Sequence, residues 1–374
     1  MRKIRVLVVD DSALVRRIIS DALASAPEIE IAGTCANGRI ALARIPQVNP
    51  DIVTLDIEMP VMNGLDTLKE LRKTYLRLPV IMFSTLTERG ASATLDALSL
   101  GANDYVTKPS NTGGATAALQ KIRDELIPKI KAHCARADKA VATAVGHPPF
   151  RATSNLIESK RFQRHGTRVD LVAIGVSTGG PSALGRLVPQ VPAHFPVPVV
   201  IVQHMPPIFT KFLADRLSSK AHIQVDEALN MQELQSGRAY IAPGDSHMVL
   251  VRDNGLVRVR THKGPPENSC RPAVDVLFRS VADVYGDHAL GVIMTGMGQD
   301  GLRGSQAIYD AGGQILAQDA ATSVVWGMPG FVANAGLADK VLPLEMLAGE
   351  IVARVSRYRL PGRPGADRIP LEGR

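Results

Sequence analysis

The sequence predicts two α/β domains in tandem. Apolar runs of strand length alternate with segments of helical periodicity, first over residues 1–125 and again, less regularly, over 169–358. Such alternation predicts a parallel sheet with helices on both faces. Residues 126–168 lose this periodicity and gather proline, glycine and basic residues, which is typical of a flexible linker. We therefore expect two sheet domains joined by a linker, with a basic tail at 359–374.

Composition places the chain among globular proteins. Its hydrophobic fraction of 45% is ordinary for that class. No apolar run reaches the roughly 20 residues that a membrane span requires. The N-terminal apolar patch ends in two aspartates, so it predicts a strand and not a signal peptide. Cys35, Cys134 and Cys270 lack metal-ligand spacing, and we expect a cytoplasmic protein without membrane insertion.

The net charge of +7 does not predict nucleic-acid binding. Many basic residues lie in the irregular segments Lys129–Arg168 and Arg354–Arg374, which are typical of a solvated linker and tail. Aromatic residues make up only 4% of the chain, and no expected helix has a basic face interleaved with them. We expect no nucleic-acid partner.

Five βα units account for the first domain. The expected strands are Arg5–Val9, Ile29–Cys35, Ile52–Leu55, Val80–Phe83 and Asp104–Val106. The expected helices are Ala13–Ala26, Arg39–Ile45, Asn63–Thr74, Ala91–Leu100 and Ala115–Ile127, the last running on to about Ala135. Right-handed crossovers would place every loop that follows a strand at one edge of the sheet.

The residues expected at that edge carry a specific chemistry. Asp10 and Asp11 end the first strand, and Asp56 ends the third. Three carboxylates require a cation, and oxygen ligands without Cys or His favour Mg²⁺ over zinc. Ser84 and Lys108, after the fourth and fifth strands, could hydrogen-bond and neutralise a phosphoryl group on a carboxylate. Each residue alone could be a helix cap or a surface charge, but the five together predict a phosphorylation site.

This segment resembles response-regulator receiver domains over its whole length, in the motifs VVDDS, TLDIEMPVMNG, FSTLT and YVTKP. The resemblance implies a flavodoxin-like (βα)5 fold, with Asp56 as the residue that accepts a phosphoryl group from a histidine kinase. It implies a Mg²⁺ site formed by Asp10, Asp11, Asp56 and the Ile57 carbonyl. It also implies three residues that sense the phosphoryl group: Ser84, Tyr105 and Lys108.

The second domain is expected to contain a mostly parallel sheet flanked by helices, together with a β-hairpin. The expected strands are Asp170–Ile174, Val197–Val202, Arg238–Ile241, His247–Val251, Val257–Arg260, Ala289–Met294 and Gln314–Ala317. The expected helices are Pro181–Val188, Ile208–Lys220, Arg271–Val284, Gly301–Ala311, Ser323–Ala335 and Leu344–Arg357. The hairpin is predicted by Asp253-Asn254-Gly255 between two alternating runs.

One stretch of this domain, LVAIGVSTGGPSALGRL at Leu171–Leu187, predicts a glycine-rich turn between a strand and a helix. Pro181 suits the first helical position, so Ser177 lies at a corner where its hydroxyl can stand clear of the sheet. The corner could hold a nucleophilic serine or a phosphate group. A dinucleotide fold would end the next strand in an acidic residue, but this strand ends in His204, and no P-loop Lys-Ser/Thr pair is present. The phosphate site is therefore disfavoured.

A serine nucleophile requires a base and a group that fixes the tautomer of the base. His204 ends the adjacent strand, and Asp300 lies in the glycine-rich loop after strand Ala289–Met294. Alone, His204 could be a packed histidine, and Asp300 could cap the following helix. With Ser177 at the same sheet edge, the two predict a Ser-His-Asp triad. The backbone around Met297 could supply oxyanion donors.

Other candidates are weaker. Thr178 is an alternative hydroxyl, but a β-branched nucleophile without a terminal amine is unusual. Cys270 precedes an expected helix start, yet no partner is visible, so we interpret it as a packing residue. Four other histidines have no ligand spacing and are interpreted as structural or surface residues: His194, His222, His247 and His288.

The second domain resembles the catalytic domain of the chemotaxis receptor methylesterases, in the motifs GVSTGGP, VIVQHMP, AYIAPG, SCRPAVDVLF and TGMGQDG. The match covers roughly Asp170–Arg357. It implies a catalytic triad of Ser177, His204 and Asp300, with Met297 beside the oxyanion site and no cofactor in this domain. The family removes methyl esters from glutamates of the cytoplasmic part of chemoreceptors, releasing methanol, and many members also deamidate receptor glutamines.

We therefore expect a signalling hydrolase that works as a monomer. Because a switch domain is joined to an enzyme, we hypothesise that the unphosphorylated first domain covers the Ser177 site and that phosphorylation uncovers it. A phosphorylation-controlled DNA-binding regulator would need a helix-turn-helix, and none is visible. A non-catalytic receptor-binding adaptor on the same scaffold is a further alternative.

Overall fold

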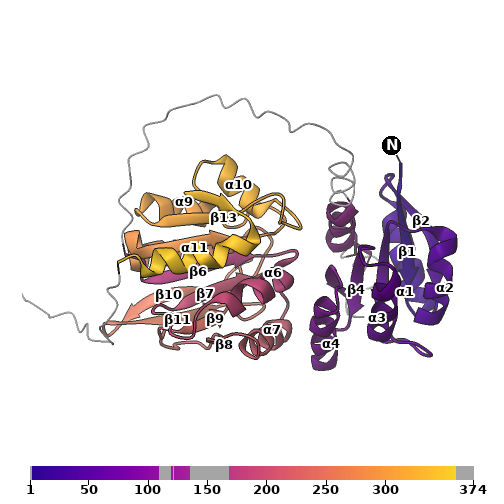
Figure 1. Cartoon of the computed structure of the whole chain (residues 1–374), viewed down its shortest axis with the longest axis horizontal. Helices are drawn as coiled ribbons and strands as arrows, with labels where there is room; N and C mark the ends of the chain where they lie inside the picture. The colour runs from indigo at the N-terminus through magenta and orange to yellow at the C-terminus, as the bar shows by residue number, and fades with distance from the viewer. Residues whose placement is uncertain (1, 109–118, 121, 135–167, 359–374) are drawn as a thin grey trace, which may run out of the picture.

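The computed structural model describes residues 2–108, 119–120, 122–134 and 168–358, and these form two α/β domains (Figure 1). The predicted tail and most of the predicted linker lie outside the described residues, as does the start of the fifth predicted helix. Within the described ranges, no helix combines the length and the apolar character needed to span a bilayer.

Among the described residues, the first domain contains a five-stranded parallel sheet with the order β2-β1-β3-β4-β5. The strands are β1 (Ile4–Val9), β2 (Ile29–Cys35), β3 (Ile52–Asp56), β4 (Val80–Ser84) and β5 (Asp104–Thr107). The helices are α1 (Ala13–Ala24), α2 (Gly38–Val48), α3 (Gly64–Thr74) and α4 (Glu88–Ser99), and residues 122–134 are also helical. All five predicted strands are confirmed. The central strand β3 is wholly buried, because helices cover both faces of the sheet.

Each of the four helices begins after a short polar residue whose side chain accepts a backbone N–H of the first turn. The cap residues are Ser12, Asn37, Asn63 and Thr87. Thr87 explains one difference from the prediction. Its Oγ1 accepts the N–H of Gly90 at 3.0 Å, so α4 begins at Glu88 and not at Ala91.

The described part of the second domain contains a seven-stranded sheet with the order β14-β13-β12-β6-β7-β9-β8, in which every pair is parallel. The strands are β6 (Leu171–Val176), β7 (Val199–Gln203), β8 (Gln224–Glu227), β9 (Arg238–Ile241), β12 (Ala289–Ile293), β13 (Gln314–Gln318) and β14 (Lys340–Leu342). The helices are α6 (Gly180–Leu187), α7 (Phe209–Ser218), α8 (Val274–Tyr285), α9 (Leu302–Asp310), α10 (Met328–Asn334) and α11 (Leu344–Ser356), with short 3₁₀ turns η2 (Val188–Gln190) and η3 (Gly286–His288). The mostly parallel sheet is confirmed.

The two edge strands β8 and β14 were not predicted. Each is short and only partly buried, so neither has the continuous apolar run that marks the central strands. The predicted hairpin is confirmed as β10 (His247–Asp253) paired antiparallel with β11 (Leu256–His262), and it forms a separate two-stranded sheet. Asn254 and Gly255 both have positive φ, as a tight two-residue turn requires.

Helix α10 was predicted to begin at Ser323, but it begins at Met328. The intervening residues instead run beside the glycine loop that follows β12. Gly296 donates its N–H to the Val325 carbonyl and forms a β-bridge with Trp326. This pairing uses backbone groups that a helix would need, and it fixes the position of the loop.

Chain order places three loops together in the second domain. From β6 the chain moves outward through β7 and β9, whereas β12 lies on the other side of β6 and leads outward to β13 and β14. The strand order therefore reverses at β6 and β12, which is where open α/β sheets form their binding crevice. The loops after β6, β7 and β12 meet at this point.

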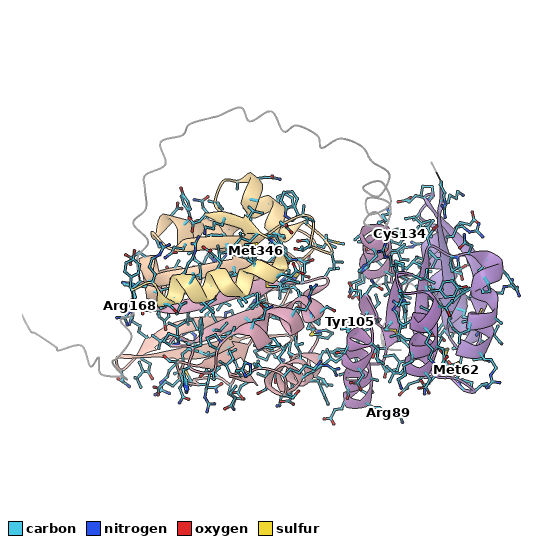
Figure 2. All side chains as sticks on the ribbon, viewed as in Figure 1. Met62, Arg89, Tyr105, Cys134, Arg168 and Met346 are labelled. Carbon is cyan, nitrogen blue, oxygen red and sulfur yellow. The ribbon has the colours of Figure 1, made fainter. Side chains whose placement is uncertain are left out.

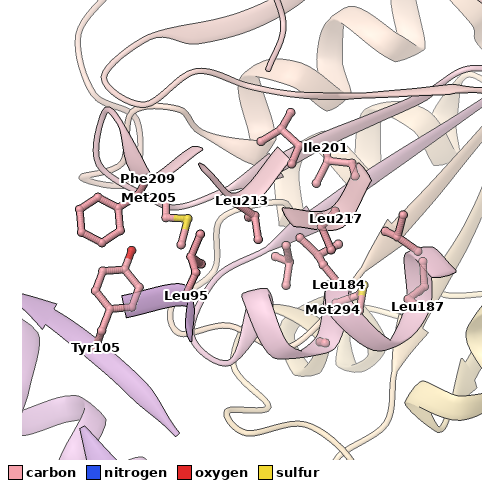
Figure 3. Packing of buried hydrophobic residues seen from close by; sticks show 14 of the residues in the cluster. Leu95, Tyr105, Leu184, Leu187, Ile201, Met205, Phe209, Leu213, Leu217 and Met294 are labelled. Carbon is pink, nitrogen blue, oxygen red and sulfur yellow. The ribbon is translucent and has the colours of Figure 1, made fainter. Parts of the chain in front are cut away.

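The two domains are in contact through α4, which packs against α6 and α7 (Figure 1). Tyr105 lies on the side of the first domain that faces the second (Figure 2) and stacks on Phe209, with ring centroids 5.2 Å apart. Leu95 and Met205 belong to the same buried apolar cluster (Figure 3). At its rim, Arg216 donates to Asp96 at 2.6 Å. One apolar core thus continues from the first domain into the second.

Candidate active site and phosphorylation site

The first site lies at the carboxyl ends of β1 and β3. Asp10 and Asp56 are buried, whereas Asp11 is exposed to solvent. The Nζ of Lys108 lies 2.7 Å from Asp56 Oδ2 and 3.0 Å from Asp10 Oδ2. Ligand oxygens of the three aspartates all lie within 4.8 Å of one another. The predicted carboxylates and lysine are therefore brought together.

Burial raises the pKa of Asp56 to about 6, and the neighbouring Asp10 carboxylate adds to this, although the Lys108 hydrogen bond lowers it. A divalent cation would offset the repulsion between these carboxylates. The Ile57 carbonyl, the fourth predicted ligand, accepts the Gly64 N–H at 2.9 Å, and a carbonyl oxygen has a second lone pair for a cation. The oxygen-only ligand set fits Mg²⁺. An open cavity lined by Asp11, Ile57 and other residues leads to it.

The two other predicted switch residues, Ser84 and Tyr105, contact partners other than Asp56. The Ser84 hydroxyl is buried and donates to the Gly90 carbonyl at 3.0 Å. Tyr105 is 7% exposed and stacks on Phe209 of the second domain. Among the described residues, no hydrogen bond joins either side chain to the Asp56 carboxylate.

The second site begins at the glycine corner after β6. Gly179 has φ +78°, and a Cβ on Gly180 would lie 1.9 Å from Gln203 Oε1. The corner therefore needs glycine both for its backbone turn and for its close packing. The Ser177 carbonyl accepts the Gly180 N–H at 2.7 Å and the Gln203 side-chain amide at 3.1 Å. These contacts fix the backbone of Ser177 at the start of α6.

The ends of the neighbouring strands hold the other two loops against this corner. His204 donates its backbone N–H to the Val176 carbonyl at 3.2 Å, and Ser177 donates to the Thr295 carbonyl at 3.0 Å. A Cβ on Gly296 would lie 2.9 Å from the Ser177 Cβ, so the glycine loop passes directly beside the serine. Ser177, His204 and the loop with Met297 and Asp300 thus lie at one sheet edge.

The His204 ring is hydrogen-bonded to the Asp300 carboxylate. Its Nε2 lies 2.7 Å from Asp300 Oδ2, and its Nδ1 lies 3.5 Å from Cys270 Sγ. A carboxylate only accepts hydrogen, so Nε2 carries a proton, and in the neutral ring Nδ1 has the lone pair that can act as a base. Within the described part of the chain, no hydrogen bond joins the Ser177 hydroxyl to His204.

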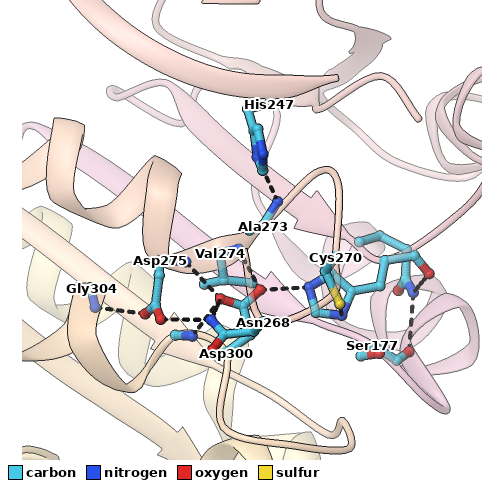
Figure 4. Close-up of polar contacts among 12 residues, drawn as sticks. Ser177, His247, Asn268, Cys270, Ala273, Val274, Asp275, Asp300 and Gly304 are labelled. Atoms are coloured by element: carbon cyan, nitrogen blue, oxygen red, sulfur yellow. Dashed lines mark hydrogen bonds and ion pairs between the residues drawn. The ribbon is translucent and has the colours of Figure 1, made fainter. Parts of the chain in front are cut away.

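Asp300 is fixed by four further donors (Figure 4). The backbone N–H groups of Val274 and Asp275, at the start of α8, donate at 2.7 and 3.0 Å. Gly301 and the Asn268 side-chain amide each donate at 3.0 Å. Burial raises the pKa of Asp300, but the His204 hydrogen bond and the backbone donors outweigh it and lower the pKa below its usual value. Asp300 is therefore an ionised, rigidly held carboxylate.

The same contacts act on His204. Burial lowers its pKa, but the hydrogen bond with Asp300 and the contact with Cys270 raise it to about 10. The interpretation of Cys270 as a packing residue without a partner was wrong, because its sulfur faces the His204 ring. Asn268 was missed altogether. Its amide bridges Asp275 and Asp300, and no motif marked it because its role comes from the path of a loop.

Comparisons with known proteins match each domain to a family. A family model described as CheB methylesterase matches residues 172–351, and one described as response regulator receiver domain matches residues 6–120. A protein-glutamate methylesterase/protein-glutamine glutaminase of Trichodesmium erythraeum is 55% identical over 355 residues, covering 95% of this chain and 100% of that protein. A relative with the same name from Nocardioides sp. is 48% identical, covering 96% of this chain and 97% of that protein.

Solved structures match each domain separately. The catalytic domain of Thermotoga maritima CheB methylesterase is 43% identical, with a TM-score of 0.49, and covers 50% of this chain and 98% of that one. The response regulator domain of the same protein is 40% identical, with a TM-score of 0.32, and the match covers 36% of this chain and 98% of that domain. On the similarity of the full-length relatives, the chain belongs to the family of protein-glutamate methylesterases/protein-glutamine glutaminases, hydrolases of the CheB type that carry a receiver domain.

Proposed function

We propose that this protein hydrolyses glutamyl methyl esters of chemoreceptors through Ser177, His204 and Asp300, and that it also deamidates receptor glutamines. The observation that carries this proposal is the His204–Asp300 hydrogen bond of 2.7 Å, with Asp300 held by four further donors beside the glycine corner of Ser177. A base oriented by a fixed carboxylate is what an activated serine requires.

In the proposed reaction, Ser177 Oγ attacks the ester carbonyl while His204 Nδ1 takes the hydroxyl proton. Asp300 remains ionised and stabilises the imidazolium that forms. The imidazolium then protonates the leaving methoxide, which departs as methanol, and water hydrolyses the glutamyl enzyme by the same route. Gly296 donates its N–H to Val325, so the oxyanion donors would be the N–H groups that follow it, beginning with Met297.

The first domain would control this reaction. A histidine kinase would supply the phosphoryl group to Asp56, with Mg²⁺ held by the neighbouring aspartates and the Ile57 carbonyl. Met205, next to His204, is buried in the interface cluster with Tyr105 and Phe209. The unphosphorylated receiver would therefore cover the edge of the active site, and phosphorylation would shift the population towards an open arrangement. We propose that the enzyme acts as a cytoplasmic monomer.

Methanol release from methylated receptor membranes tests the catalytic proposal. Wild type should release methanol, and Ser177→Ala should reduce release to the background level. Thr178→Ala is the matched control for the neighbouring hydroxyl and should keep most of the activity. Equal release by wild type and Ser177→Ala would instead support a receptor-binding adaptor.

Removing residues 1–165 tests the regulatory proposal in the same assay. The truncated protein should release methanol faster than the unphosphorylated full chain. A rate that is unchanged or lower would refute inhibition by the receiver.

A further inference from the structure

The thiol of Cys270 faces the catalytic base of the proposed triad, and none of the proposed bond-making or bond-breaking steps involves it. Its Sγ lies 3.5 Å from His204 Nδ1. The other cysteines, Cys35 and Cys134, are buried in the first domain, whereas Cys270 is partly exposed and the His204 side chain is 13% exposed. Both residues are therefore partly exposed to the solvent from which an ion would approach.

We propose that Cys270 Sγ and His204 Nδ1 form a binding site for a thiophilic divalent cation, Zn²⁺ above all, and that occupation of this site inhibits the esterase. Thiolate and imidazole are the ligands that zinc prefers, and a tetrahedral ion with bonds of about 2.3 Å to sulfur and about 2.0–2.1 Å to nitrogen separates the two atoms by about 3.5 Å. The observed spacing of 3.5 Å therefore needs little rearrangement to accept the ion.

The surroundings of the pair also suit a metal ligand. A metal-bound histidine usually donates its other ring N–H to a carboxylate, which fixes the ring and makes it a better ligand. His204 Nε2 already makes this bond with Asp300 at 2.7 Å, and one ligand atom from each of the three residues lies within 4.8 Å of the others. Solvent or the substrate side of the crevice would supply the remaining ligands.

Binding and catalysis would then exclude each other. The ion displaces the thiol proton of Cys270 to solvent, together with the Nδ1 proton wherever the His204 ring is protonated, and takes the lone pair of His204 Nδ1. That lone pair is the one that would accept the Ser177 proton, so the inhibitory part of the inference rests on the proposed function. The binding part does not.

Cobalt titration of the full-length protein tests binding directly. Excess Mg²⁺ is kept present so that the oxygen-ligand site at Asp10 and Asp56 is filled. Wild type should develop thiolate-to-cobalt charge-transfer absorption that saturates at one equivalent and is displaced by Zn²⁺. Cys270→Ser should lack this absorption, whereas Cys35→Ala, the matched control thiol, should keep it. Asp300→Asn should weaken cobalt binding by about 10–100-fold, as loss of an outer-shell partner does.

Methanol release tests inhibition. Equimolar Zn²⁺ should lower the wild-type rate by about tenfold or more, and a chelator that binds zinc but not magnesium should restore it. In Cys270→Ser, the ratio of rates with and without Zn²⁺ should approach one. No charge-transfer absorption in wild type, or equal absorption in Cys270→Ser, would overturn the proposed site. If cobalt binds as expected while Ser177→Ala still releases methanol, the catalytic assignment fails and the metal site stands.

Discussion

Asp56 and Asp300 both lie at the carboxyl edge of a parallel sheet, Asp56 at the end of β3 and Asp300 in the loop after β12, and each is 2% exposed. Burial raises the pKa of both carboxyls, yet the pKa of Asp56 ends near 6 and that of Asp300 ends below its usual value. The difference lies in the partners. Asp56 has the Lys108 ammonium, one backbone donor from Glu58 and another carboxylate beside it, whereas Asp300 accepts hydrogen from His204 and four further donors.

This difference matches the two chemistries that we propose. A carboxylate that must react with a phosphoryl group and bind a cation is left under-compensated, so that a ligand supplies the missing positive charge. A carboxylate that must hold a histidine through every step receives all its hydrogen bonds from the protein, and the dipole of α8, whose N-terminus points at it, adds positive potential. Burial alone does not decide the role of an acidic residue; the number and sign of its partners do.

Replacing Asp300, the carboxylate with the full set of donors, should have the largest effect on activity. Asp300→Asn keeps the shape but removes the charge that holds His204 in its tautomer, and we expect methanol release to fall by about 10⁴-fold, as in other triads. Asp275→Asn is the matched control. Asp275 is also buried near the start of α8, but its side-chain carboxylate accepts hydrogen from Asn268 and Gly304 and does not contact His204 through a hydrogen bond among the described residues. Steady-state rates at one pH measure both variants, and equal losses would show that Asp300 acts only through stability.

The glycine corner gives the next largest effect. A Cβ on Gly180 would overlap Gln203, which is buried and donates its amide to the Ser177 and His204 carbonyls. Moving Gln203 would break these bonds, so Gly180→Ala should cost about 1–3 kcal/mol of unfolding free energy and also lower activity by displacing Ser177. Gly185, one turn further along α6, has no atom within 4 Å of such a Cβ. Gly185→Ala should therefore stabilise the protein by about 0.5–1 kcal/mol. Urea unfolding of the two variants checks this contrast, and a shift of the same sign in both would contradict it.

These residues also show which features of the protein can be predicted from its sequence. The central strands and the residues that follow them were predictable, because they depend on local patterns and on the rule that parallel strands end at one edge. Asn268 and Cys270 were not predictable. They reach Asp300 and His204 from a loop whose path depends on packing far along the chain. The short edge strands β8 and β14 were missed for the same reason, since their neighbours define them more than their own composition does.

The Cys270 contact should appear in the pH dependence of the reaction. Cys270 contributes to the raised pKa of His204, and His204 must be neutral to accept a proton, so the rate should rise with pH as the ring loses its proton. Removing the sulfur lowers the pKa of His204, and the neutral ring is then present at lower pH. Cys270→Ala should therefore shift the acidic limb of the kcat/KM profile to lower pH. An acidic limb that stays at the same pH or moves to higher pH would show that Cys270 does not raise the pKa of His204.

The smallest effect on the rate should come from an ion pair between the two domains. Arg216 pairs with Asp96 across the domain interface at 2.6 Å, and the Asp96 side chain is 51% exposed. Such pairs contribute about 0–1 kcal/mol, so Arg216→Ala should raise the basal rate of the unphosphorylated enzyme by at most about fivefold. Arg186 pairs with Glu345 within the second domain, and Arg186→Ala should leave the basal rate unchanged. A double-mutant cycle with Asp96→Ala separates the pair from other effects of Arg216. If neither Arg216→Ala nor Asp96→Ala changes the basal rate, the apolar stack of Tyr105 on Phe209 carries the inhibitory contact without help from this ion pair.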